Sequence, residues 1–189
     1  REASVRLSPP YFFEHLVAPF MRWVGEEWHC GRLGVAEEHF ATASVQHALY
    51  DFGLQGTSEE LPGVVVCTLP GNHHEIGALL VAAAVVLEGW RPIYLGRDVP
   101  AREVSRIAIE RDARVVAVSA TYVKEPGLIL SELQLLRNVL PDEVRVVVGG
   151  EAAVKSAELF TRAGAVVVAD LQEFRDALSN SLGPEADAD

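Results

Sequence analysis

Cysteine is scarce in this chain of 189 residues, because it occurs only at Cys30 and Cys67. Two cysteines are too few for a disulfide framework or a cysteine-rich zinc site, and they agree with a reducing compartment. Long apolar runs are also missing, since the longest run of apolar residues and glycine is Ile76 to Leu87. A membrane-spanning helix needs roughly 20 such residues, and no secretory leader opens the sequence. We therefore expect a cytoplasmic protein that has no membrane partner.

Basic residues are outnumbered, with 16 Lys and Arg against 27 Asp and Glu and a formal net charge of -11. This charge repels phosphate backbones at long range. We therefore expect the chain to reach DNA only through a further domain or a partner protein. With 49% hydrophobic and 23% charged residues, the composition is that of a globular protein.

Residues 1–56 carry apolar side chains at helical spacing, which predicts a small helical domain. One helix is expected from Tyr11 to Trp28 and a second from Gly34 to Tyr50, before a polar connector. Two helices cannot enclose a core by themselves. Their apolar faces must be covered by the rest of the chain, by another copy or by further helices of a bundle. We therefore expect a homo-oligomer or a partial helical bundle.

From residue 63 to 183 short β-branched runs alternate with helical stretches, which predicts an α/β domain with a parallel sheet. The five expected strands are 64–68, 92–95, 115–119, 144–148 and 165–169. The five expected helices are 74–88, 101–111, 128–140, 152–163 and 171–182. Such a chain folds as a doubly wound, flavodoxin-like or Rossmann-like sheet whose ligand crevice lies beyond the carboxyl ends of the strands. The acidic tail, 184–189, is expected to be disordered.

Unusual residues follow three of the predicted strands. These are Asn72, His73, His74 and Gly77 after the first strand, Ser119 and Thr121 after the third, and Gly149 and Gly150 after the fourth. There is no G-x-G-x-x-G fingerprint after the first strand and no phosphate-binding Gly-Lys-Ser/Thr loop, so neither kind of nucleotide site is expected. A histidine in such a loop is a potential metal ligand. Alternatively, His73 or His74 only caps the following helix or is solvated.

The series N-x-H-x-x-G, S-x-T, G-G resembles the cobalamin-binding domain of methionine synthase, mutases and their relatives. That family has D-x-H-x-x-G, S-x-L and G-G at similar separations, and here 41 residues separate Gly77 from Ser119. The resemblance covers residues 63 to about 182. It implies that His74 coordinates cobalt from below in place of the cofactor's benzimidazole. It also implies that Ser119, Gly149 and Gly150 line the channel for the nucleotide tail.

The chain departs from that signature at two positions. Asn72 stands where the family has a carboxylate, and Thr121 stands where it has leucine. The asparagine carbonyl is expected to accept a hydrogen bond from the imidazole, but without a negative charge it raises ligand basicity less. We therefore expect weaker cobalt ligation by His74 than in the family.

A second pattern lies in the helical region, where Trp28 is followed after nine residues by Glu38 and His39. Taken alone, this is equally typical of an amphipathic hairpin with a solvated polar face. Beside the cobalamin series, it resembles the cap of the CarH-type light-sensing transcriptional regulators, and Val35 is similarly placed. In that family adenosylcobalamin is the chromophore and visible light breaks its cobalt–carbon bond.

The second resemblance implies roles for the cap residues. Trp28 would pack against the adenosyl group, Glu38 would hydrogen-bond it, and His39 would contact the edge of the corrin. His29 would bind cobalt after photolysis as the replacement upper ligand, and the cap and the oligomeric state would then change. The function expected from this resemblance is an adenosylcobalamin-dependent sensor that regulates transcription and has no enzymatic turnover.

Two other interpretations stay open at this point. One is a corrinoid-carrying subunit of a cobalamin-dependent methyltransferase, in which His74 tunes the cobalt and the cap shields a methyl group. That interpretation gives His29 no role, because a methyl carrier needs no second cobalt ligand. The other is a zinc site of His29, Cys30 and His39, whose spacing suits a helical hairpin. It leaves the loop series of the sheet unexplained.

Overall fold

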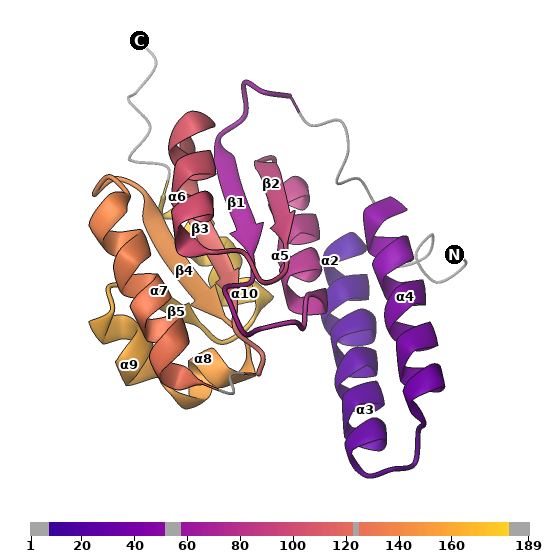
Figure 1. Ribbon diagram of the computed structural model, residues 1–189. Helices are drawn as coiled ribbons and strands as arrows, with labels where there is room; N and C mark the ends of the chain where they lie inside the picture. Colours follow the sequence, from indigo (N-terminus) through magenta and orange to yellow (C-terminus); the bar gives the residue numbers. More distant parts are fainter. Residues whose placement is uncertain (1–7, 52–57, 123–124, 182–189) are drawn as a thin grey trace. The chain divides into compact units, whose positions relative to one another are not determined.

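A computed structural model describes residues 8–51, 58–122 and 125–181 (Figure 1). The chain divides into two compact units, residues 1–56 and 57–189, which are described separately. The predicted connector glycines, Gly53 and Gly56, and the predicted disordered tail at 184–189 lie outside the described residues.

The second unit is built on a five-stranded, all-parallel sheet in the order β2-β1-β3-β4-β5. This order confirms the predicted doubly wound, flavodoxin-like α/β fold. The strands are β1 (Gly63–Cys67), β2 (Arg91–Gly96), β3 (Ala113–Ser119), β4 (Arg145–Gly149) and β5 (Val166–Val168). Each lies within two residues of its predicted position, because runs of buried valine mark strands that are covered on both faces.

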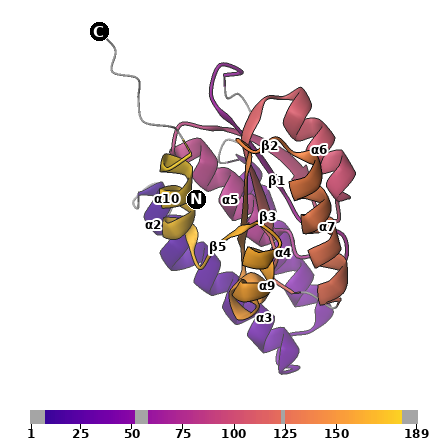
Figure 2. The same cartoon turned by 90° about the vertical axis from the view of Figure 1, so that its left-hand side faces the viewer.

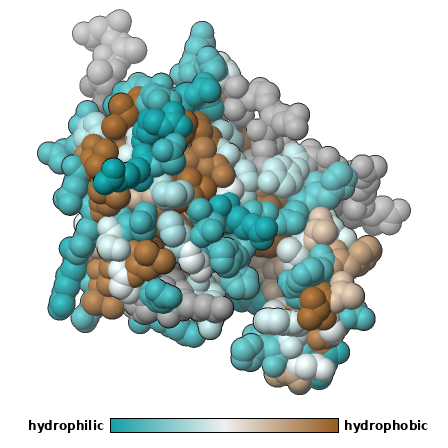
Figure 3. All heavy atoms as spheres, viewed as in Figure 1, coloured by the Kyte–Doolittle hydropathy of each residue, from teal (hydrophilic) through white to brown (hydrophobic). Residues whose placement is uncertain are grey.

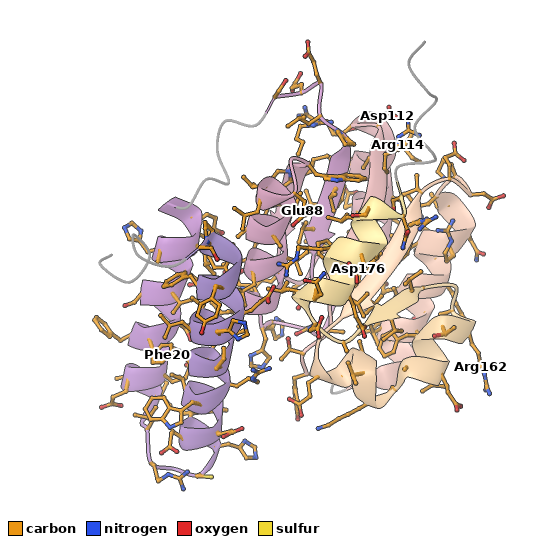
Figure 4. All side chains as sticks on the ribbon, turned by 180° about the vertical axis from the view of Figure 1, so that it is seen from behind. Phe20, Glu88, Asp112, Arg114, Arg162 and Asp176 are labelled. Atoms are coloured by element: carbon orange, nitrogen blue, oxygen red, sulfur yellow. The ribbon has the colours of Figure 1, made fainter. Side chains whose placement is uncertain are left out.

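Helices cover both faces of this sheet (Figure 2). On one face lie α5 (Ile76–Leu87) and α10 (Leu171–Ser179), and on the other lie α6 (Ala101–Glu110) and α7 (Pro126–Val139). Glu88, just after α5 and labelled in Figure 4, pairs with Arg175 of α10 at 3.7 Å, so an ion pair joins these two helices. Among the described residues, no helix has the length and apolarity that crossing a membrane requires.

The structure differs from the sequence prediction at the helix expected over 152–163. Two short helices stand there, α8 (Glu151–Lys155) and α9 (Ala157–Arg162), and Ser156 lies between them at φ -123° and ψ 32°. Serine favours such a break because its hydroxyl competes for backbone hydrogen bonds. The apolar side of α9 still packs inward through Phe160, so the hydrophobic pattern continues across the break.

The first unit is a helical hairpin. Its first arm comprises α2 (Pro9–Phe12), the π-helical turn η1 (Phe13–Val17) and α3 (Ala18–His29), and its second arm is α4 (Val35–Asp51). Two arms were predicted, but the π turn was not. Pro19 explains its position, because proline has no N–H to donate to the preceding turn, and the N–H of Ala18 bonds five residues back to the carbonyl of Phe13.

The two cysteines differ in environment and should differ in reactivity. Cys30 is exposed, whereas Cys67 is fully buried in β1, and burial raises the pKa of the Cys67 thiol to about 12. Only the thiolate reacts with electrophiles. We expect a thiol reagent at pH 8 to label Cys30 alone in the folded protein and both cysteines in denaturant. Native labelling that persists in the Cys30→Ser variant would contradict this burial.

Candidate functional site

Three loops that sequence analysis singled out meet at the carboxyl edge of the sheet. The side-chain nitrogen of Asn72, in the loop after β1, donates to the carbonyl of Ser119 at the end of β3 at 2.7 Å. The N–H of Ala120 donates to the carbonyl of Gly149 at the end of β4, also at 2.7 Å. These bonds link the loops after β1, β3 and β4, as the crevice rule for doubly wound sheets requires.

Asn72 is buried, with 1% of its surface exposed, and its orientation is fixed by its partners. Because a carbonyl can only accept, the nitrogen must face Ser119, and the oxygen then accepts from the backbone N–H of His74 at 3.3 Å. The structure therefore differs from the expectation that the asparagine oxygen accepts from an imidazole ring. Asn72 instead fixes the backbone on which His74 stands.

His73 and His74 are both exposed and lie toward different neighbours. The ring of His74 meets the ring of Tyr122, after β3, edge to face with centroids 6.1 Å apart. Nδ1 of His73 lies 3.9 Å from a carboxylate oxygen of Asp98, after β2. An exposed imidazole at this edge has the donor atom that cobalt requires.

Glycine at position 77, the second residue of α5, leaves space next to β3. A Cβ there would lie 2.5 Å from Oγ of Ser119 and 3.5 Å from Oγ1 of Thr121. The loop series thus brings Gly77, Ser119 and Thr121 to one point. The hydroxyls at this point and the missing side chain fit a channel for a polar ligand tail.

Gly149 and Gly150 bring the chain close to the loop after β3. A Cβ on Gly150 would lie 2.7 Å from the carbonyl oxygen of Ala120, and Gly150 has a φ of +107°. A Cβ on Gly149 would lie 3.1 Å from a methyl group of Val168. Close backbone approach therefore requires glycine at position 150, whereas a Cβ at position 149 would press on a side-chain methyl group. Together with His74, these glycines fit the group that the resemblance implies.

Two residues of this edge were missed by sequence analysis. Asp98 follows β2, and Thr68 follows β1, and both bond to the loop that carries the histidines. The crevice rule could have pointed to Asp98, because it applies to the residues after β2 as well. No motif contains either residue, which is why motif spacing did not find them.

The five predicted cap residues belong to the helical hairpin of the first unit. Trp28 and His29 end α3, and Val35, Glu38 and His39 begin α4. A turn of five residues joins these helices, so both groups lie at the same end of the hairpin. Hydrophobic side chains reach the surface here among polar ones (Figure 3), with Trp28 45% and Val35 59% exposed.

The carboxylate of Glu38 has partners on its own helix. One oxygen lies 2.5 Å from Nδ1 of His39, and the other accepts from the hydroxyl of Thr42 at 2.7 Å. These contacts hold the Glu38 carboxylate and the His39 ring together at the start of α4. The two side chains therefore present an acceptor and an imidazole at the same end of the hairpin as the exposed indole of Trp28.

The turn between α3 and α4 is held by Arg32. Its guanidinium donates to both carboxylate oxygens of Glu27, at 2.5 and 2.7 Å, and this hydrogen bonding lowers the pKa of Glu27. Gly31 adopts a φ of +71°, the left-handed conformation that commonly ends a helix. The alternative zinc site does not form here: within the described residues no three His, Cys, Asp or Glu side chains are grouped to hold a metal ion.

Comparison with protein families gives two matches. A family described as "B12 binding domain" matches residues 62–180, and a second family of the same description matches residues 2–50. The two matches therefore cover both the sheet unit and the helical hairpin.

Two characterised relatives have similar identity. The chain is 31% identical over 153 residues to the HTH-type transcriptional repressor CarH of Myxococcus xanthus, covering 80% of this chain and 51% of the repressor. It is 32% identical over 161 residues to a dimethylamine corrinoid protein of Methanosarcina barkeri, covering 82% of this chain and 75% of that protein. The chain thus spans about half of the repressor and three quarters of the corrinoid protein.

Solved structures share the fold. The monomethylamine corrinoid protein of Methanosarcina barkeri aligns with a TM-score of 0.63 at 18% identity, covering 86% of this chain and 78% of that one. A cobalamin-binding protein of Desulfitobacterium hafniense DCB-2 aligns with a TM-score of 0.54 at 21% identity, with the same coverage.

Proposed function

This chain belongs to the family of B12-binding domains, and from that membership we propose that it is an adenosylcobalamin-dependent light sensor. Family membership makes a cobalamin its cofactor. The adenosyl form and the response to light are our proposal. The observation that carries it is the grouping of Trp28 and His29 with Glu38 and His39 at one end of the helical hairpin.

In this proposal the carboxyl edge of the sheet holds the cofactor. His74 would supply an imidazole nitrogen to cobalt, on a backbone that Asn72 fixes. Gly77 and Gly150 allow α5 and the loop after β4 to approach β3 and the loop after it closely, and the hydroxyl of Ser119 at this edge would line the channel for the nucleotide tail. Bound adenosylcobalamin supplies a cobalt–carbon bond that visible light can break.

The hairpin residues act on the upper side of the cofactor. Trp28 offers an exposed indole for packing against an adenosyl group, and Glu38 offers a carboxylate acceptor for its hydroxyl or amino groups. Val35 and His39 complete this surface. His29, next to Trp28 at the end of α3, would be the residue that binds cobalt in place of the adenosyl group.

Such a sensor responds by changing its oligomeric state or its partner, and it turns over no substrate. A ligand exchange at cobalt would supply the two-state element that a switch requires. With a net charge of -11 the chain is repelled by DNA, so we propose that regulation of transcription runs through a DNA-binding domain or a partner protein.

A second candidate is a corrinoid-carrying subunit of a methyltransferase. It is favoured by the dimethylamine corrinoid protein, of which this chain covers three quarters at 32% identity. A methyl carrier needs His74 but has no use for a second cobalt ligand at His29. The behaviour of His29 therefore discriminates between the two candidates.

The test is the absorption spectrum of the chain reconstituted with adenosylcobalamin without oxygen in the dark. We expect green light to change the spectrum of the bound cofactor. The His29→Ala variant should bind equally in the dark and give a different illuminated spectrum, because the replacement ligand is absent. A wild-type spectrum that illumination leaves unchanged would contradict light sensing, and identical illuminated spectra would remove His29 from the account.

A further inference from the structure

The histidine loop after β1 is anchored by Asp98, a residue of the loop after β2. One carboxylate oxygen of Asp98 accepts from the N–H of Gly71 at 2.8 Å, and the other lies 3.9 Å from Nδ1 of His73. The backbone N–H of Asp98 donates to the hydroxyl of Thr68 at 2.9 Å, and that hydroxyl donates in turn to the carbonyl of Asn72. Asp98 is thus hydrogen-bonded to the loop at two points, Thr68 and Gly71.

Asp98 reaches this position in an unfavourable backbone conformation. Its φ is +60°, in the left-handed region that residues other than glycine seldom adopt, although aspartate tolerates it better than most. Such a conformation persists where the surrounding contacts hold it, and it is often found at functional sites. Here the contacts that hold it are those with Gly71 and Thr68.

Sheet order gives the two histidines different surroundings. Because β1 lies between β2 and β3, the histidine loop is flanked by the loops that follow those two strands. His73 lies by Asp98 on the β2 side, and His74 lies by Tyr122 on the β3 side. The β3 side is also where Ser119 is found.

We propose that Asp98 decides which of the two adjacent histidines binds cobalt. The proposal rests on the proposed role of His74 as the axial ligand. Both imidazoles are exposed and could donate to a metal, so exposure alone does not distinguish them. The carboxylate of Asp98 holds His73 on the β2 side, and His74 is left to face the cofactor. Asn72 cannot replace this carboxylate, because both ends of its amide are bonded to backbone.

Electron paramagnetic resonance of bound cob(II)alamin in the dark tests this positioning role. The unpaired electron of cobalt(II) couples to an axial nitrogen, so protein labelled with 15N-histidine splits each line into a doublet, whereas the cofactor's own 14N-benzimidazole gives a triplet. The wild type should show the doublet, and His74→Ala should lose it. The double variant His74→Ala with Asp98→Gly should recover it through His73, and adding His73→Ala should abolish it again.

Glycine is chosen at position 98 because it adopts a φ of +60° without strain. If Asp98→Gly does not fold, Asp98→Asn replaces it with the same expectation, since asparagine tolerates that conformation and keeps an acceptor for Gly71. A doublet that persists in His74→Ala, or one that does not return in the double variant, would overturn the proposal. A wild type without a doublet would instead overturn His74 as the ligand. Light sensing can fail without affecting any of these dark spectra.

Discussion

Replacing His74 by alanine is expected to abolish the retention of cobalamin. Losing a residue that only supports a metal ligand weakens binding by about 10- to 100-fold, so losing the ligand itself should cost at least about 100-fold. The side chain is exposed, and the backbone bond from His74 to Asn72 does not depend on the imidazole. The measurement is the amount of cofactor that elutes with the protein in gel filtration, read from its visible absorption.

The matched control is His47→Ala, an exposed histidine of α4 that the proposed site does not use. It should retain cofactor like the wild type. Thermal unfolding of the cofactor-free variants should agree with the wild type, because substitutions at exposed positions usually change stability by about 0.5 kcal/mol or less. Full retention by His74→Ala would show that the lower ligand lies elsewhere.

Replacing Gly150 by alanine is expected to destabilise the fold as well as the site. The new Cβ would lie 2.7 Å from the carbonyl oxygen of Ala120 and 2.8 Å from its carbon, and both are backbone atoms that cannot rotate away. The φ of +107° adds strain that alanine cannot relieve. Together these effects should cost about 3 kcal/mol or more in the free energy of unfolding. Urea denaturation of the cofactor-free protein measures this change.

Gly127→Ala is the control for that measurement. Gly127 is the second residue of α7, and a Cβ there would meet no atom within 4 Å. Alanine favours helix over glycine by up to about 1 kcal/mol, so this variant should be as stable as the wild type or more stable. Equal stability of the two glycine variants would show that the approach of Gly150 to Ala120, in the loop after β3, is looser than described.

Sequence patterns predicted the sheet because its physical cause is local. Strands covered on both faces must be apolar along their whole length, and the runs at Val64–Val66 and Val146–Val148 display this directly. The crevice rule places His74, Ser119 and Gly149 at one edge from the sequence alone. The order of the strands was predicted from their number, five, and from the right-handed crossovers between them.

Other features depend on contacts that no local pattern encodes. The side-chain amide of Asn72 bonds to backbone groups. Its orientation is set by the carbonyl of Ser119, which lies 47 residues further along the chain. Asp98 is important through two hydrogen bonds to a loop that precedes it by about 30 residues, and it belongs to no motif. The break at Ser156 lies within an apolar pattern that continues across it, so periodicity predicted one helix where two are present.

The most direct test of the account is the spin-resonance spectrum of wild-type chain that is labelled with 15N-histidine and loaded with cob(II)alamin in the dark. Since a nitrogen of His74 is held to replace the benzimidazole of the cofactor, the account predicts a doublet on each cobalt line. A triplet from the cofactor's own base would contradict it, because the imidazole at the carboxyl edge of β1 would then not be bound to cobalt.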